Sequence, residues 1–222
     1  MQKEISLSQI LRGSPIPTFV IDNNHFVTHC NPAFEKLSGL AAKDIVGTKN
    51  QWLAFYPVAR PVLADFIVEG ATEEKIRLYY AAKYRKSLLV DGGYEAQDFF
   101  PSLDKKGKWL FFTAAPLRDR DGNMVGAIET LQDITDQKLA EQALRESERR
   151  YRKLLDFVPY PTVVFSLDGR VSYLNPAFTE TFGWSLEELE GGSIPYVPKG
   201  YEQETHDAIR KLFKDRRILR HE

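Results

Sequence analysis

A segment of 33 residues occurs twice in this chain, and this repeat constrains the fold more than any other feature. Residues 15–47 align with residues 159–191 at a constant offset of 144 without a gap, and 11 of the 33 positions are identical. Both segments contain the run Asn-Pro-Ala-Phe, at Asn31–Phe34 and at Asn175–Phe178. Agreement of this extent at one offset indicates that the chain contains one fold twice.

Each copy of the repeat predicts a β-hairpin that leads into short helices. Apolar runs at 18–21 and 162–165 are followed by polar turns and by second apolar runs, which is typical of hairpins. Asn31 and Asn175 each precede a proline, as a helix N-cap precedes proline in the first turn. Gly39 and Gly183 are expected to end these helices, because glycine readily adopts the left-handed conformation found there.

The remainder of the first copy predicts helices at 61–69 and 73–89, followed by strands at 94–100, 108–116 and 123–133. Together with the hairpin, this order predicts an α+β fold, a five-stranded antiparallel sheet with helices on one face. The second copy contains one further helical segment, at 201–216, and a basic tail at 211–220 that we interpret as a solvated helix face. Because no closing strands follow, we expect this tandem second copy to be truncated.

Three features resemble the PAS family of sensor modules: the hairpin leading into Asn-Pro-Ala-Phe, the Gly-x₇-Gly spacing after it, and the segment Gly126–Thr135. Within that segment, the run Asp133-Ile134-Thr135 before a charged helix is similar to the family's signal-exit motif. The resemblance implies a first PAS domain at residues 1–135 with a short N-terminal helix. It also implies a helical linker at 136–153 and the N-terminal part of a second domain at 154–222.

The linker predicts a helix that pairs with a second copy of the chain. It contains neither glycine nor proline and is rich in good helix formers. Spacings of four and three residues define a candidate dimer seam made of Ala140, Leu144, Ser147, Tyr151, Leu154 and Val158. Such a seam favours a parallel coiled coil and a homodimer. The alternative is a lone amphipathic helix packed on its own domain.

Composition excludes several classes of partner and location. The 30 basic and 31 acidic residues give a net charge of −1, so we expect no nucleic-acid binding. No run of 18 apolar residues occurs, which predicts a cytoplasmic fragment without membrane contact, although the parent protein could be anchored elsewhere. The single cysteine, Cys30, cannot form an intrachain disulfide.

The sequence shows no catalytic constellation, so we expect this fragment not to be an enzyme. We predict no metal site, since His25 and His29 would lie on one strand face about 13 Å apart. By resemblance, haem is disfavoured because the helix expected to face the sheet has no histidine, which leaves only His29. Flavin–cysteine photochemistry is disfavoured because Cys30 lies in the hairpin. The cofactor is therefore unknown.

A small-molecule ligand remains compatible with the sequence, and the resemblance to flavin-binding relatives points to strand residues that would face a cavity. The inward carboxylate of Glu129 needs a partner there, such as His29, Arg60 or a nearby tyrosine, unless it reaches water at a strand end. The aromatic segment 51–68 either forms a wall of the pocket or belongs to the core. The ligand-pocket candidates are His29, Trp52, Tyr56, Arg60, Leu110, Phe112, Glu129 and Leu131.

These expectations combine into two functional hypotheses. The first is a sensory and dimerisation module that passes a ligand- or redox-dependent signal through the helical linker to an output domain outside this chain. By resemblance, that output is a histidine kinase of a two-component phosphorelay. The second is a structural PAS pair that binds no ligand and only dimerises or spaces a diguanylate cyclase or transcription-activator output.

Overall fold

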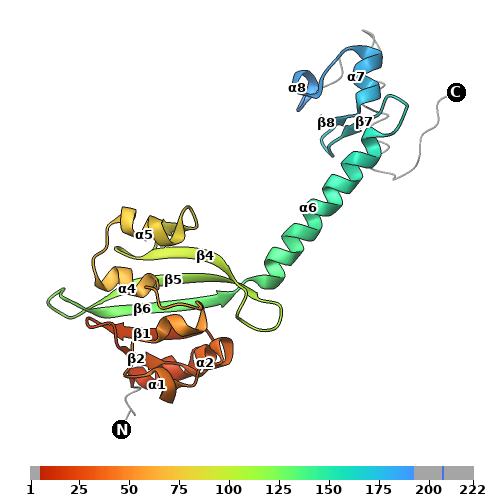
Figure 1. Cartoon of the computed structure of the whole chain (residues 1–222). Coiled ribbons are helices and arrows are strands. Elements are labelled where there is room, and N and C mark those ends of the chain that lie inside the picture. The colour runs from red at the N-terminus through yellow and green to blue at the C-terminus, as the bar shows by residue number, and fades with distance from the viewer. Residues whose placement is uncertain (1–5, 193–206, 208–222) are drawn as a thin grey trace. The chain divides into compact units, whose positions relative to one another are not determined.

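The computed structural model describes residues 6–192 and residue 207 of the 222-residue chain, and it divides into two compact units (Figure 1). The first unit comprises residues 1–141 and the second comprises residues 142–222. The division falls inside helix α6 (Thr135–Asp156). The helix predicted at 201–216 and the basic tail at 211–220 lie outside the described residues, apart from Asp207.

The first unit follows the predicted order of a hairpin, short helices and three long strands. Its elements are α1 (Leu7–Gly13), β1 (Thr18–Asp22), β2 (Val27–Cys30), α2 (Pro32–Ser38), α3 (Ala42–Ile45), η1 (Gln51–Ala54), α4 (Leu63–Val68), α5 (Glu73–Tyr80), β3 (Tyr84–Lys86), β4 (Tyr94–Phe100), β5 (Lys108–Arg118) and β6 (Met124–Asp133).

The strands form one antiparallel sheet in the order β2-β1-β6-β5-β4-β3. The α+β class is confirmed, but the expectation of five strands is corrected to six. The sixth strand, β3, lies within the segment 73–89 that the sequence predicted to be one helix. Helix α5 ends at Tyr80 because Ala81 adopts φ 50° and ψ −123°, which is incompatible with a continuing α-helix.

Pairing with β4 explains why the chain becomes extended after α5. Tyr84 pairs with Ala96 in the antiparallel register, and its ring packs against that of Tyr94. The flanking cations form ion pairs, Lys83 with Asp98 and Arg85 with Glu95. These cross-strand contacts form only when β4 is in place, so tertiary structure overrides the good helix formers of this segment.

Helix α4 packs across β1, β5 and β6, and the core of the first unit lies between the helices and this face of the sheet. Aromatic rings fill much of it. Phe34 makes edge contacts with Phe19 and Phe55, and Phe55 continues the chain of rings to Phe100. Phe100 in turn packs against Phe112 on β5. Burial of these rings is the main source of stability for the unit.

The second unit repeats the first hairpin and helix pair, with β7 (Val163–Phe165), β8 (Val171–Leu174), α7 (Pro176–Phe182) and α8 (Leu186–Leu189). Asn31 Oδ1 accepts hydrogen bonds from the backbone N–H groups of Thr18 and Phe34, at 3.0 and 2.9 Å. Asn175 Oδ1 accepts equivalent bonds from Thr162 and Phe178, at 2.8 and 3.0 Å. The asparagine therefore caps the helix and also ties it to its hairpin in both copies.

Both repeat helices end at glycines in the left-handed conformation, with φ 74° at Gly39 and φ 80° at Gly183. The interpretation of the repeat as one local structure used twice is confirmed. Among the helices that the structure describes, none is both long enough and apolar enough to cross a membrane.

Candidate functional site

The inward-facing residues of the central strands form the floor of the candidate site. Glu129 on β6 stands between Phe19 on β1 and Ala114 on β5 in the strand register. In the neighbouring row Leu131 pairs with Phe112. These side chains are buried on the helix-facing side, as is Leu110. The alternation of the strands thus places the four predicted strand residues, Leu110, Phe112, Glu129 and Leu131, in the core.

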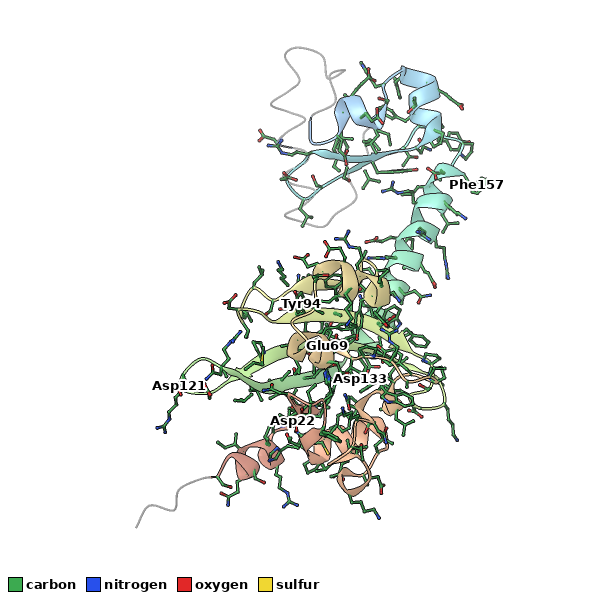
Figure 2. All side chains as sticks on the ribbon, turned by 60° about the vertical axis from the view of Figure 1, so that its left-hand side comes forward. Asp22, Glu69, Tyr94, Asp121, Asp133 and Phe157 are labelled. Atoms are coloured by element: carbon green, nitrogen blue, oxygen red, sulfur yellow. The ribbon has the colours of Figure 1, made fainter. Side chains whose placement is uncertain are left out.

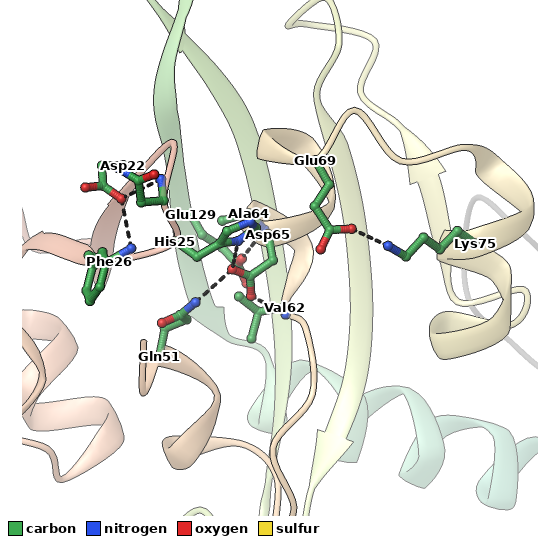
Figure 3. A network of polar contacts seen from close by, with 11 residues as sticks. Asp22, His25, Phe26, Gln51, Val62, Ala64, Asp65, Glu69, Lys75 and Glu129 are labelled. Carbon is green, nitrogen blue, oxygen red and sulfur yellow. Dashed lines mark hydrogen bonds and ion pairs between the residues drawn. The ribbon is translucent and has the colours of Figure 1, made fainter. Parts of the chain in front are cut away.

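Glu129 is buried, with only 2% of its surface exposed, so of the two alternatives the inward position holds and the one in which it reaches water at a strand end is wrong. Its Oε2 atom accepts a hydrogen bond of 2.8 Å from the backbone N–H of Ala64 in α4 (Figure 3). Burial raises the pKa of Glu129 to about 8, the Ala64 bond opposes this shift, and the charge of Asp65 adds to it. The carboxyl group is therefore protonated at neutral pH.

A second buried acidic residue, Asp65, organises the start of α4 (Figure 3). It accepts hydrogen bonds from the backbone N–H of Val62 at 2.9 Å and from Nε2 of Gln51 at 2.8 Å. His25 Nδ1 lies 2.7 Å from Oδ1 of the same carboxylate. Sequence reasoning missed this network, because nothing in the local sequence indicates that residues 25, 51 and 65 meet.

His25 also corrects the prediction that it shares a strand face with His29. It lies in the hairpin turn with φ 67°, before β2 begins at Val27. His29 lies on β2 and is exposed, with Nδ1 3.1 Å from the hydroxyl of Thr28. His29 is thus not part of the buried site. Within the described residues, no group of three or more His, Cys, Asp or Glu side chains could hold a metal ion.

Arg60, in the segment between η1 and α4, lies among three tyrosine rings. Its guanidinium carbon is 4.0 Å from the ring centre of Tyr56 and 5.2 Å from those of Tyr79 and Tyr80. Cation–π attraction favours this arrangement. We call Arg60 and these three rings the arginine cage. Two of the pocket candidates, Tyr56 and Arg60, are therefore brought together by the fold.

The cage is adjacent to the buried carboxyl group and to the aromatic core. Burial raises the pKa of Tyr56 to about 12, although the charge of Arg60 and a hydrogen bond from the Tyr80 hydroxyl oppose the shift. Burial also raises the pKa of Tyr80 well above its usual value, and Tyr56 and Glu129 add to this shift. Tyr80 packs against Phe112 in turn. Trp52, the remaining candidate, is half-buried against the same core.

A separate surface groove of about 240 Å³ lies at the far end of the sheet from α6. It is lined by the end of α4, by Tyr94 at the start of β4 and by Arg118 and Met124 beside the β5–β6 turn. Figure 2 shows Tyr94 and Asp121 in this part of the first unit. No pocket candidate from the sequence lines the groove.

The exit motif joins the sheet to α6 through a set of hydrogen bonds. The backbone N–H of Ile134 donates to the carbonyl of Trp109, and Thr135 Oγ1 accepts from the backbone N–H of Trp109. Asp133, labelled in Figure 2, accepts from the backbone N–H of Thr135 and forms an ion pair with Lys108. Its cation partner thus lies on β5.

Burial raises the pKa of Asp133, but its hydrogen bonds with Lys108 and Thr135 outweigh burial and hold that pKa below the usual value. Asp133→Ala is therefore expected to cost about 1 kcal/mol of stability, the usual contribution of such polar contacts. Amide hydrogen exchange should increase in the first turn of α6 more than elsewhere. Asp133→Asn, which keeps an acceptor for Thr135, should change exchange less. Equal exchange in both variants would contradict this role.

Most side chains of the candidate dimer seam are exposed to solvent in the single chain. Helix α6 has no buried residue, and the exposed fractions of Leu144, Tyr151 and Leu154 are 61%, 65% and 60%. Ser147 and Val158 are half-buried, and Ala140 is exposed. Phe157, labelled in Figure 2, follows the helix and is also exposed. An apolar stripe of this kind on a surface helix is typical of a contact with another chain.

Comparison with known proteins gives the same assignment as the hairpins, the sheet and the exit motif. Residues 15–136 match the PAS domain family, and residues 149–222 match the PAS fold family. The chain belongs to the PAS domain family and contains two copies of the domain. The matched ranges leave only residues 137–148 between them, which lie inside α6.

Relatives of this chain include sensor proteins. The two-component sensor PprA of Pseudomonas aeruginosa is 26% identical over 189 residues, which cover 83% of this chain and 18% of that protein. A phytochrome of Picea abies is 27% identical over 188 residues, covering 82% and 15%. The sensor protein FixL of Bradyrhizobium diazoefficiens is 26% identical over 117 residues, covering 53% and 23%. The chain thus spans less than a quarter of each of these relatives.

Among solved structures, the PAS domain of Bordetella pertussis BvgS is 16% identical, with a TM-score of 0.38, and the match covers 63% of this chain and 92% of that one.

Proposed function

We propose that this chain is the cytoplasmic sensory and dimerisation region of a multidomain signalling protein, and that it passes a ligand- or redox-dependent signal through α6. The observation that carries the proposal is the exit junction. Trp109 on β5 hydrogen-bonds with both Ile134 and Thr135, and Asp133 pairs with Lys108. A change in the central strands therefore alters the contacts that hold the first turn of α6.

The output domain that we propose is a histidine kinase. The peroxide stress-activated histidine kinase mak1 of Schizosaccharomyces pombe supports this choice, since it is 29% identical to this chain over 116 residues, which cover 7% of that protein. The chain itself supplies no catalytic group in the proposal. Its part is to sense, to dimerise and to set the state of the helix that leads towards the next domain.

The filled aromatic core favours a second candidate, a structural PAS pair without a ligand. Ring contacts run from Phe55 through Phe100 to Phe112, so the space between the helices and the sheet is largely occupied. Native mass spectrometry of freshly purified protein separates the two candidates. A stoichiometric small molecule on the protein would support sensing, whereas the mass of the unmodified chain alone would favour the structural pair.

Dimerisation through α6 predicts that a charge on the seam weakens association. Leu144→Glu would bury like charges across the pair and should raise the dimer dissociation constant at least tenfold in analytical ultracentrifugation. Leu139→Glu is the matched control. Leu139 lies on the same helix, off the seam, with an exposed fraction of 57% against 61% for Leu144. We expect it to leave the dissociation constant nearly unchanged.

Ser147→Leu should move the dissociation constant in the opposite direction, since it places an apolar side chain at a core position of the seam. We expect the dimer dissociation constant to rise in Leu144→Glu, to fall in Ser147→Leu and to stay nearly unchanged in Leu139→Glu. Monomers at all concentrations, or equal effects of the two glutamate substitutions, would contradict dimerisation through this seam.

A further inference from the structure

The guanidinium group of Arg60 has fewer polar partners than its burial requires. Its Nη2 donates a hydrogen bond to the carbonyl of Tyr79, but that bond is long, at 3.3 Å. Its Nε is fully buried and has no acceptor among the described residues. A buried donor without an acceptor is rare in folded proteins, because it loses its hydrogen bonds to water without replacement.

The positive charge of Arg60 also has no carboxylate partner in the part of the chain that the structure describes. The acids of the neighbouring elements are engaged or neutral. Asp98 pairs with Lys83, and Asp65 binds Gln51 and the backbone of α4. Glu129, which influences the same tyrosines, is protonated at neutral pH. The cage therefore holds a partly buried cation whose charge no carboxylate of residues 6–192 compensates.

The three tyrosine rings form the walls of the cage around the cation of Arg60. The guanidinium carbon of Arg60 lies over the ring of Tyr56, and the rings of Tyr79 and Tyr80 approach it from the last turn of α5. Tyr79 is 39% exposed, so this wall of the cage borders solvent. A guanidinium can bind a carboxylate or a phosphate through two parallel N–H donors, but its single charge balances a carboxylate and not a phosphate dianion.

We propose that the arginine cage is a receptor for the carboxylate group of a small organic acid. The carboxylate would accept hydrogen bonds from the Nε–H and an Nη–H of Arg60, and the attached apolar or aromatic body would lie against the tyrosine rings. The inference deepens the proposed sensory function by naming the class of ligand. It also gives an acceptor to the buried Nε–H of Arg60, which has none among the described residues.

Isothermal titration of the whole 222-residue chain tests the proposal with three probes: benzoate, acetate and inorganic phosphate. We expect benzoate to bind more tightly than acetate, since only benzoate has a ring to stack, and phosphate to bind least. Arg60→Gln should weaken benzoate binding at least tenfold. Arg118→Gln is the matched control, because Arg118 is an arginine of the same unit that lines the separate groove. It should bind benzoate as the parent chain does.

A second measurement tests the proposal even if the Arg60→Gln variant does not fold. In ¹⁵N-labelled protein the Nε–H signal of one arginine should move when benzoate is added, and that signal should be missing in Arg60→Lys, which keeps the charge. Circular dichroism establishes that each variant is folded. Absence of benzoate binding by the parent chain, binding that survives Arg60→Gln, or loss of binding in Arg118→Gln would each overturn the proposal. Association through α6, measured without any probe, stays an independent test of the proposed function.

Discussion

Replacing Phe34 with alanine is expected to lower the free energy of unfolding of the first PAS domain by about 3–5 kcal/mol, the range for removing a large aromatic ring from a core. Phe34 is fully buried and makes edge contacts with two other rings. Its ring centre lies 5.3 Å from that of Phe19 and 6.3 Å from that of Phe55. Its removal leaves a cavity between the hairpin and α2, because the capping of that helix by Asn31 holds the backbone in place.

Urea denaturation followed by circular dichroism measures this change, and Phe26→Ala is the matched control. Phe26 belongs to the same hairpin but is 39% exposed, with Lys49 over its ring. Its truncation should cost less than about 1 kcal/mol, as for most surface substitutions. Equal losses in the two variants would show that Phe34 does not anchor the core.

Glu129→Gln is expected to remove most of the pH dependence of stability of the first domain between about pH 5 and 8. The pKa of Glu129 is about 8 in the folded chain, above its ordinary value of 4.5. The folded state therefore holds a proton that the unfolded state releases. The stabilising contribution is fully present below pH 4.5 and declines as the pH rises, until it is lost above the folded pKa near 8.

The slope of this decline approaches about 1.4 kcal/mol per pH unit for one proton. Denaturation of the parent chain and the variant at several pH values measures it. The difference between their unfolding free energies should change steadily across this range and favour the glutamine variant at high pH. Glu95→Gln is the control, since the pKa of Glu95 is lowered by hydrogen bonds from Arg85 and Ser87. Parallel pH profiles for the parent chain and Glu129→Gln would contradict a raised pKa.

Much of the fold could be predicted because its signals are local. The strand Tyr94–Phe100 was predicted with the bounds that it has in the fold, and the strands β5 and β6 were predicted within two residues. The asparagine caps and the glycine ends of the repeat helices followed from residue types alone. The alternation of side chains along β5 and β6 also agrees with the expected inward positions of Phe112 and Glu129.

The candidate site was predicted only in part, because it is assembled from segments that are distant in the sequence. Arg60 and Tyr56 were candidates, but the rings of Tyr79 and Tyr80 reach them only because α5 packs back over the sheet. His29 was equally suitable by residue type, yet it is exposed on β2. Residue chemistry identified groups that can bind, and topology decided which of them meet.

The helix caps and the helix ends of the repeat were determined by the sequence itself, because each depends on neighbours a few residues away and on the backbone preferences of those residues. Tertiary structure decided the sixth strand, the turn position of His25 and the partner of Glu129. Each of these depends on a contact across the fold: Tyr84 with Ala96, His25 with Asp65, and Glu129 with the N–H of Ala64. A local sequence pattern does not predict such contacts, because they stabilise the fold only when both segments are in place.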